Sequence, residues 1–274
     1  RPLPPAMAGD CLPIAKSYGV EELLADTAGL NLAKSVHVEA GFDYAASPLI
    51  ETAWLQGLAD ASGFPQAIVA KASLQDPEVE SVLAAQREHA NVRGIRHMVS
   101  WHEVPQNTFI GRPDLLTDIQ CLAGFALLEK HDLSIHLPFY PPQMADAAAL
   151  AAKHPDTAIA LCHTGMPLDR DPESLELWRR GMAALAEQPN VTVKISGLGM
   201  FDHGWTAESI RPYVLHAIEC FGTERCMFGS NFPVDKLYSS YRAIYEAFDE
   251  ITRDFSEGER AALFAGNAER FYRI

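Results

Sequence analysis

The chain has little cysteine and no long apolar run, and each shortage excludes a class of protein. Only five of its 274 residues are cysteines, and no two of these have C-x-x-C spacing. This pattern speaks against a disulfide framework and fits a reducing compartment. No stretch approaches the roughly 20 apolar residues that a membrane-spanning helix requires. We therefore expect a cytoplasmic protein without a membrane partner.

Basic residues are scarce as well. Lys and Arg total 22 against 36 Asp and Glu, which gives a net charge of −14. Such a chain would repel the phosphates of a nucleic acid, so nucleic-acid binding is not expected. An anionic small molecule would have to bind at a local group of cations. No glycine-rich phosphate loop follows any predicted strand, so dinucleotide binding has no support either.

Short apolar, β-branched runs alternate with amphipathic helical segments along the whole chain. This order predicts an α/β fold with a parallel sheet and helices outside it. The predicted strands are 35–40, 67–72, 92–99, 133–137, 158–162, 191–196 and 226–229. No change in composition marks a second domain, so residues 1–274 are predicted to form one.

The predicted architecture is a (β/α)₈ TIM barrel, with an open doubly wound sheet as the alternative. Seven runs are one short of such a barrel. The chain begins with Arg1 in a proline-rich stretch without periodicity. We therefore expect the first strand of the barrel to precede Arg1.

Alternation along the strands predicts which side chains face the barrel interior. In SVHVEA at 35–40, valines that face the helices would leave His37 and Glu39 inward. The same reasoning turns Arg96 inward from the third strand. Further inward polar groups are predicted on later strands: Ser134, His136, Lys194 and Ser196. Because barrel interiors are mostly apolar, this convergence favours a site over a core.

Each of these residues also has a structural explanation when it is taken alone. A single inward histidine is more often a hydrogen-bonded core group than a ligand. Lys194 could form a structural ion pair with Glu39. Alternation leaves the orientation of the His163 side chain open, because His163 shares the parity of the apolar Ile159 and Leu161. Only a bend before Gly165 would turn it inward.

The end of the last predicted strand carries polar residues where pairing must stop. The run 226–229 ends at Gly229, and Ser230 and Asn231 follow it. Pro233 then prevents the strand from continuing. In α/β folds ligands bind at this end of the strands.

Several segments together resemble the amidohydrolase-2 branch of the amidohydrolase superfamily, which consists of TIM-barrel hydrolases. The resemblance covers nearly the whole chain and rests on SVHVEA (35–40), VRGIR (92–96), LCHTGMP (161–167), VKISGLGM (193–200) and GNAERFY (266–272). Similar proteins include sugar-acid lactonases and a pyrone-dicarboxylate lactonase, with decarboxylases more distant. The resemblance implies a hydrolase.

The resemblance also implies roles for single residues. His163 corresponds to the family's histidine at the end of the sixth strand, and this implies that it faces inward. Asn231 stands where the superfamily has an aspartate, and His136 stands where close relatives often have one. The family's His-x-His pair on the first strand has no match in this chain. That pair would complete a metal site with His163 and His136, with zinc as the expected ion and a metal-independent site as the alternative.

The predicted activity is hydrolysis of a cyclic ester of a small carboxylated or sugar acid. Lactone hydrolysis requires a base for the water and positive charge for the oxyanion. The predicted catalytic residues are His163, Asn231, His136 and Asp235, and those predicted to bind substrate are Arg96, Lys194, Ser196, His37 and Glu39. The alternatives are a decarboxylase and a non-catalytic binding barrel. The sequence leaves the oligomeric state open.

Overall fold

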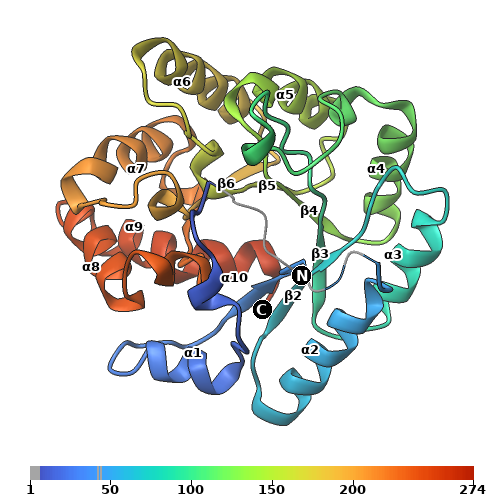
Figure 1. The fold of residues 1–274 in the computed structure, drawn as a ribbon, viewed down its shortest axis with the longest axis horizontal. Coiled ribbons are helices and arrows are strands. Elements are labelled where there is room, and N and C mark those ends of the chain that lie inside the picture. The colour runs from blue at the N-terminus through green and yellow to red at the C-terminus, as the bar shows by residue number, and fades with distance from the viewer. Residues whose placement is uncertain (1–6, 42, 44) are drawn as a thin grey trace.

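Seven parallel strands form one sheet, and each strand pairs with the next one in the sequence (Figure 1). The computed structural model describes residues 7–41, 43 and 45–274. Its strands are β1 (Val36–Val38), β2 (Ala67–Lys71), β3 (Val92–Arg96), β4 (Ser134–Leu137), β5 (Ile159–Leu161), β6 (Val191–Ile195) and β7 (Cys226–Phe228). Every strand lies inside a predicted run, so the parallel α/β prediction is confirmed.

Helices surround the strands in Figure 1 and cover the outer face of the curled sheet. The helices of the described residues are α1 (Val20–Asp26), α2 (Leu49–Ser62), α3 (Val79–Arg87), α4 (Ile119–Lys130), α5 (Met144–Lys153), α6 (Pro172–Ala186), α7 (Ala207–Phe221), α8 (Tyr241–Ile251), α9 (Glu257–Ala261) and α10 (Asn267–Tyr272). Unlike the covering helices, α10 contributes side chains to the inner face of the sheet. Within the described part of the chain, no helix is long and apolar enough to cross a membrane.

Sequence signals explain where several helices start. The Asp171 carboxylate accepts hydrogen bonds from the backbone N–H groups of Glu173 and Ser174, and Pro172 is the first residue of α6. Proline costs nothing there because the first N–H of a helix has no partner. Ser256 and Glu259 form a reciprocal capping box at the start of α9.

Two apolar layers lie on opposite faces of the sheet. The outer layer joins the strands to the helices through residues such as Ile95, Ile135 and Leu161. The inner layer is smaller and fills the interior: Val36, Val38, Ala67, Val69, Ala160, Met227, Ala268, Phe271, Tyr272 and Ile274. The last four of these belong to α10 and the chain end, so the C-terminal segment packs inside the curled sheet, between β1 and β7.

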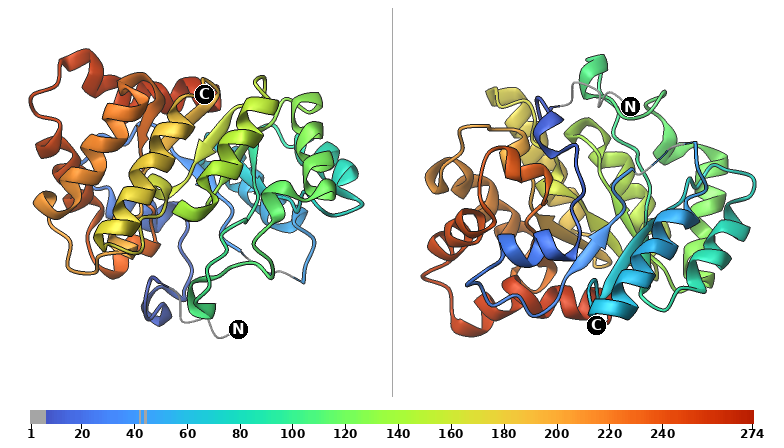
Figure 2. Two further views of the ribbon diagram at one scale, coloured as in Figure 1. Left: turned by 90° about the horizontal axis from the view of Figure 1, so that it is seen from above. Right: turned by 60° about the horizontal axis from the view of Figure 1, so that its bottom comes forward.

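The described start of the chain, from residue 7, and the C-terminus lie at opposite ends of the sheet (Figure 2). The described N-terminal segment contacts loops that follow strands, whereas α10 contacts Glu224, just before β7. Among the described residues β7 does not pair with β1. The arrangement is that of a TIM-barrel fold with seven strands, and the strand expected before Arg1 stays a prediction.

Candidate active site

The strand register shows which polar side chains face the interior. Arg96 pairs with Lys71 on one side and with His136 on the other, and His136 pairs with the inner-layer residue Ala160. Lys194 pairs with Met227, another inner-layer residue. Residues paired in register on parallel strands point to the same face of a sheet. Arg96, His136 and Lys194 therefore face inward, as alternation predicts.

His136 lies completely buried above the aromatic side chains of the C-terminal segment. Its ring stacks on Tyr272 at 5.6 Å between centroids and meets Phe271 edge-on at 5.8 Å. Neither ring nitrogen has a hydrogen-bond partner among the described residues. Burial, followed by the charges of Lys194 and Arg96, holds the pKa of His136 well below its usual value. The imidazole is therefore neutral, with both nitrogens available to a ligand.

His163 also belongs to this group, and the backbone explains why alternation left it open. His163 and Thr164 both have positive φ angles, 51° and 56°. A left-handed turn directly after β5 breaks the alternation of the strand. Burial, then Lys194, Arg96 and His136, lower the pKa of His163 well below its usual value. These neighbours place His163 in the interior, and its Nδ1 lies 3.1 Å from the Ser196 hydroxyl.

A carboxylate lies beside Arg96 in the site. Glu39 lies 3.7 Å from Arg96 Nε and also accepts a hydrogen bond from the Gly41 N–H. Its partner is thus Arg96, and the ion pair considered between Glu39 and Lys194 does not form. Burial, and then the like charge of Arg96, lower the pKa of Lys194. Lys71, on β2, pairs with Arg96 and faces the same interior. The sequence did not predict this, because β2 is apolar at every position before Lys71 and its two faces look alike.

The predicted inward orientation of His37 is wrong. Its Nε2 lies 3.3 Å from Glu51 on α2, outside the sheet, while Val36 and Val38 pack in the inner layer. Burial raises the pKa of Glu51, but hydrogen bonds from His37 and from the Ala40 N–H bring it below its usual value. His37 therefore ties β1 to α2. Apolar layers lie against both faces of the sheet, so the valines of β1 do not indicate which of its faces lies inside.

Asn231 and Asp235 form a pair at the same end of the sheet. The Asn231 amide donates to Asp235 Oδ1 at 3.1 Å, and Asn231 has a positive φ of 55°. Asp235 is 4% exposed, and burial raises its pKa to about 7 despite this hydrogen bond. The described contacts join Asn231 to Asp235 and not directly to the histidines. Gly229, two residues earlier, packs against the Lys194 stem, since an added Cβ would lie 3.4 Å from it.

Residues 7–9 lie across loops that follow β4, β6 and β7. His203 and Tyr238 stack at 3.9 Å; the His203 ring donates to the Met7 carbonyl and the Tyr238 hydroxyl to the Ala8 carbonyl. Gly9 has a φ of 72°, and a Cβ there would overlap the Tyr238 hydroxyl. The segment therefore covers part of the mouth.

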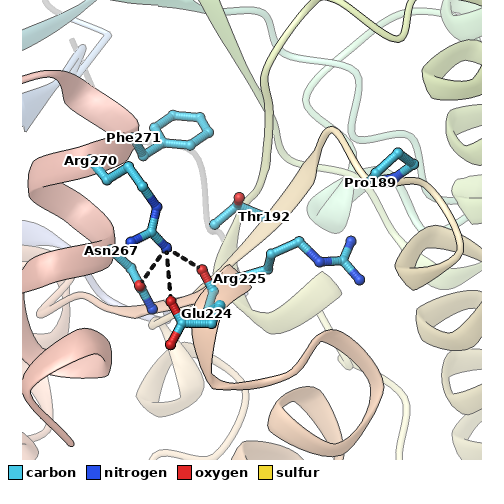
Figure 3. A pocket seen from close by; sticks show the side chains of 7 residues that line it. All are labelled: Pro189, Thr192, Glu224, Arg225, Asn267, Arg270 and Phe271. Atoms are coloured by element: carbon cyan, nitrogen blue, oxygen red, sulfur yellow. Dashed lines mark hydrogen bonds and ion pairs between the residues drawn. The ribbon is translucent and has the colours of Figure 1, made fainter. Parts of the chain in front are cut away.

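A separate hollow of about 560 Å³ lies at the opposite end of the sheet, beside α10 (Figure 3). The two guanidinium groups that line this hollow already form hydrogen bonds within the protein. Arg225 donates to the carbonyls of Gln188, Val191 and Ala186, and Arg270 donates to Glu224 and Asn267. These contacts connect backbone segments, so the hollow is not part of the candidate site.

The described residues do not form a metal site by themselves. In residues 7–41, 43 and 45–274 no three His, Cys, Asp or Glu side chains are grouped so as to hold an ion. His136 and His163 offer imidazole nitrogens, but zinc in proteins takes at least three protein ligands. The metal therefore stays a prediction, and no step below depends on it.

Comparisons with known proteins agree with this geometry. A family model described as amidohydrolase matches residues 2–274. The Sinorhizobium fredii protein y4mH is 47% identical over 98% of this chain and 90% of its own length. An L-fucono-1,5-lactonase of Burkholderia multivorans is 29% identical over 95% of this chain and 88% of its own.

Among solved structures, an amidohydrolase from Burkholderia multivorans with bound zinc has a TM-score of 0.83. It is 28% identical, with 96% of this chain and 90% of that one covered. The similarity extends over the whole seven-stranded sheet. The chain belongs to the amidohydrolase family and is a hydrolase.

Proposed function

We propose that the protein opens the ring of a lactone derived from a small carboxylated or sugar acid. The observation that carries this proposal is the group of His163, His136, Arg96 and Lys194, neutral imidazoles beside cations in one enclosed interior. Such a group suits a reaction in which a proton leaves a water and negative charge develops on a carbonyl oxygen. The 29% identical L-fucono-1,5-lactonase supports the same reaction class.

The proposed base is His163. Its low pKa keeps the ring neutral at pH 7, so a ring nitrogen retains a lone pair for a proton. The water oxygen bonds to the lactone carbonyl carbon as its proton passes to His163. Lys194 stabilises the resulting oxyanion, because an ammonium in a water-poor interior acts strongly on nearby charge.

The proposed acid is Asp235. Two titratable groups whose environments shift their pKa values in opposite directions suit the two proton transfers of one reaction. Asp235, with a pKa of about 7, carries a proton at or below neutrality. The carbon–oxygen bond of the ring breaks as the ring oxygen receives this proton. Asn231 orients Asp235 by donating to its Oδ1.

Arg96 is proposed to bind an anionic or hydroxyl-rich part of the substrate away from the cleaved bond. Its Nε is buried without a hydrogen bond, and the Glu39 carboxylate lies at 3.7 Å. A guanidinium pairs with a substrate carboxylate through two parallel hydrogen bonds. A metal-assisted form of the reaction is the alternative: a divalent ion, zinc in the first place, would be held by His136 and His163, and His163 would then not serve as the base.

Acid release from a panel of lactones, beginning with L-fucono-1,5-lactone, tests the proposal. We expect the wild-type protein to release acid, His163→Ala to lose at least about 100-fold in kcat, and His154→Ala to match wild type. His154 caps α5 and lies outside the site. Carbon dioxide release without acid from a carboxylated substrate would indicate a decarboxylase. Ligand binding without turnover would indicate a binding barrel.

A further inference from the structure

The Ser196 hydroxyl contacts the edge of the His163 ring that carries Nδ1. The distance from Nδ1 to Ser196 Oγ is 3.1 Å, and both residues are buried. Gly197 leaves room for this contact. It has a φ of 68°, and an added Cβ would lie 2.8 Å from His163 Nδ1. The ring therefore lies against the start of the loop that follows β6.

Ser196 is itself held by the residue that follows His163. The Thr164 hydroxyl accepts a hydrogen bond from the Ser196 N–H at 3.3 Å and donates to the Ser196 carbonyl at 3.4 Å. The Trp178 indole N–H donates to the Thr164 carbonyl at 2.9 Å. A chain of contacts from α6 through Thr164 thus fixes the backbone of Ser196, from which its hydroxyl extends.

The charges around His163 favour one of its two neutral tautomers. The positive charges of Lys194 on β6 and Arg96 on β3 both act on the His163 ring, and His136 on β4 is neutral. A lone pair directed toward cations is stabilised, whereas an N–H directed toward them is destabilised. Nδ1 faces the Ser196 hydroxyl, so Nε2 is the nitrogen left to face other groups of the interior, and its lone pair is the one that these cations can stabilise. Nδ1 then carries the proton and donates it to Ser196 Oγ.

We propose that Ser196, held by Thr164, is a positioning residue that accepts a hydrogen bond from His163 Nδ1–H and so keeps the Nε2 lone pair of His163 facing the substrate. This differs from the substrate-binding role that the sequence predicts for Ser196. A hydroxyl that accepts from the base controls which nitrogen takes the proton of water. The kinetic part of the inference depends on the proposed function, whereas the tautomer does not.

NMR of protein labelled with ¹⁵N-histidine measures the tautomer directly. Long-range proton–nitrogen correlations distinguish protonated from unprotonated ring nitrogens, and His163→Gln identifies the His163 signals. In wild type we expect a protonated Nδ1 and an unprotonated Nε2. Ser196→Ala should shift the population toward the Nε2-protonated form. Ser134→Ala, a buried serine on β4 that donates to the Arg93 carbonyl, should leave it unchanged.

Two further variants keep the inference testable if Ser196→Ala does not fold. Ser196→Thr retains the hydroxyl and should retain the wild-type tautomer. Thr164→Val has the shape of threonine without its hydroxyl and should shift the tautomer partly. The inference would be overturned if the His163 ring of the wild type carries its proton on Nε2. It would also be overturned if the His163 tautomer is the same in wild type, Ser196→Ala and Thr164→Val.

Kinetics with L-fucono-1,5-lactone as the probe add a second readout. We expect Ser196→Ala to lower kcat on the order of 10-fold, with KM within about 2-fold of wild type, since the base is misoriented and binding is kept. A raised KM at unchanged kcat would instead assign Ser196 to substrate binding. If wild type hydrolyses no lactone, the proposed function fails while the tautomer result still decides the role of Ser196.

Discussion

At the scale of single residues, burial changes two ionisable groups in opposite ways. It removes the charge of His163 by lowering its pKa, and it protonates Asp235 by raising its pKa to about 7. In both cases desolvation disfavours the charged form, and the direction differs because one group is a base and the other an acid. The same physical effect therefore supplies both a proton acceptor and a proton donor.

Asp235→Asn should change how stability depends on pH. The folded-state pKa of about 7 lies above the ordinary aspartate pKa of 3.8, so the folded protein binds more protons than the unfolded chain between these values. Stability contributed by the protonated carboxyl is therefore full below pH 3.8 and is lost as the pH rises through 7. The loss is on the order of 4 kcal/mol at 1.36 kcal/mol per pKa unit.

Urea unfolding at a series of pH values between 4 and 8 measures this effect. In Asp235→Asn the free energy of unfolding should not fall as the pH rises. In Asp156→Asn, at an exposed position, it should fall as in wild type. Identical pH slopes for wild type and Asp235→Asn would show that the carboxyl is ionised throughout this range.

Arg96→Ala should act mainly on substrate binding. We expect KM for an anionic lactone to rise on the order of 30-fold with kcat changed little, because binding of the ground state and of the transition state is lost together. Arg93→Ala is the control on the same strand, since its guanidinium donates to the carbonyls of Ala90 and Val92. A fall in kcat at constant KM would place Arg96 at the reacting carbonyl instead.

At the scale of elements, α10 supports the site from below. Asn267, at its first turn, donates to the carbonyls of Thr223 and Cys226 at 2.6 Å each and so attaches the helix to the start of β7. The end of the same helix brings Phe271 and Tyr272 against His136. A short helix that ends near the C-terminus therefore positions a residue on β4.

Asn267→Ala should destabilise the fold by about 2–4 kcal/mol, because two buried carbonyls lose their donor. Thermal or urea unfolding measures the loss. Arg273→Ala, at an exposed position that pairs with Asp132 at 3.5 Å, should cost under about 1 kcal/mol. Equal costs for the two variants would mean that solvent replaces the Asn267 contacts.

At the scale of the whole molecule, an acidic protein encloses a cationic interior. The net charge is −14, yet Arg96, Lys194 and Lys71 face inward from β3, β6 and β2. Strand pairing brings these charges together although Lys71 and Lys194 lie 123 positions apart in the sequence. The outer charge opposes nucleic acid, while the interior suits a small anion.

We also propose that residues 1–274 form a single domain, and limited proteolysis tests this. One continuous sheet and an outer core that extends over its whole length favour cooperative protection. We expect cleavage to be confined to exposed loops and chain ends, with no stable fragment of half the chain. A protected fragment that keeps its own secondary structure would indicate two domains.

The sequence by itself determined the seven strands and the inward positions of Arg96, His136 and Lys194. Strands of a parallel sheet are short apolar runs, and a charged side chain within such a run has only the interior mouth in which to remain solvated or paired. These features depend on local pattern, and the structure has them where the sequence predicts them.

Only the tertiary structure decided whether the side chains of His37 and His163 face the interior. The valines beside His37 fit the inner and the outer apolar layer equally well, and packing against Met227 and Tyr272 selects the inner one. His163 turns inward through a left-handed backbone that alternation does not describe. The environments of both residues come from elements distant in sequence, α2 for His37 and β6 for His163. Local periodicity carries no information about such partners.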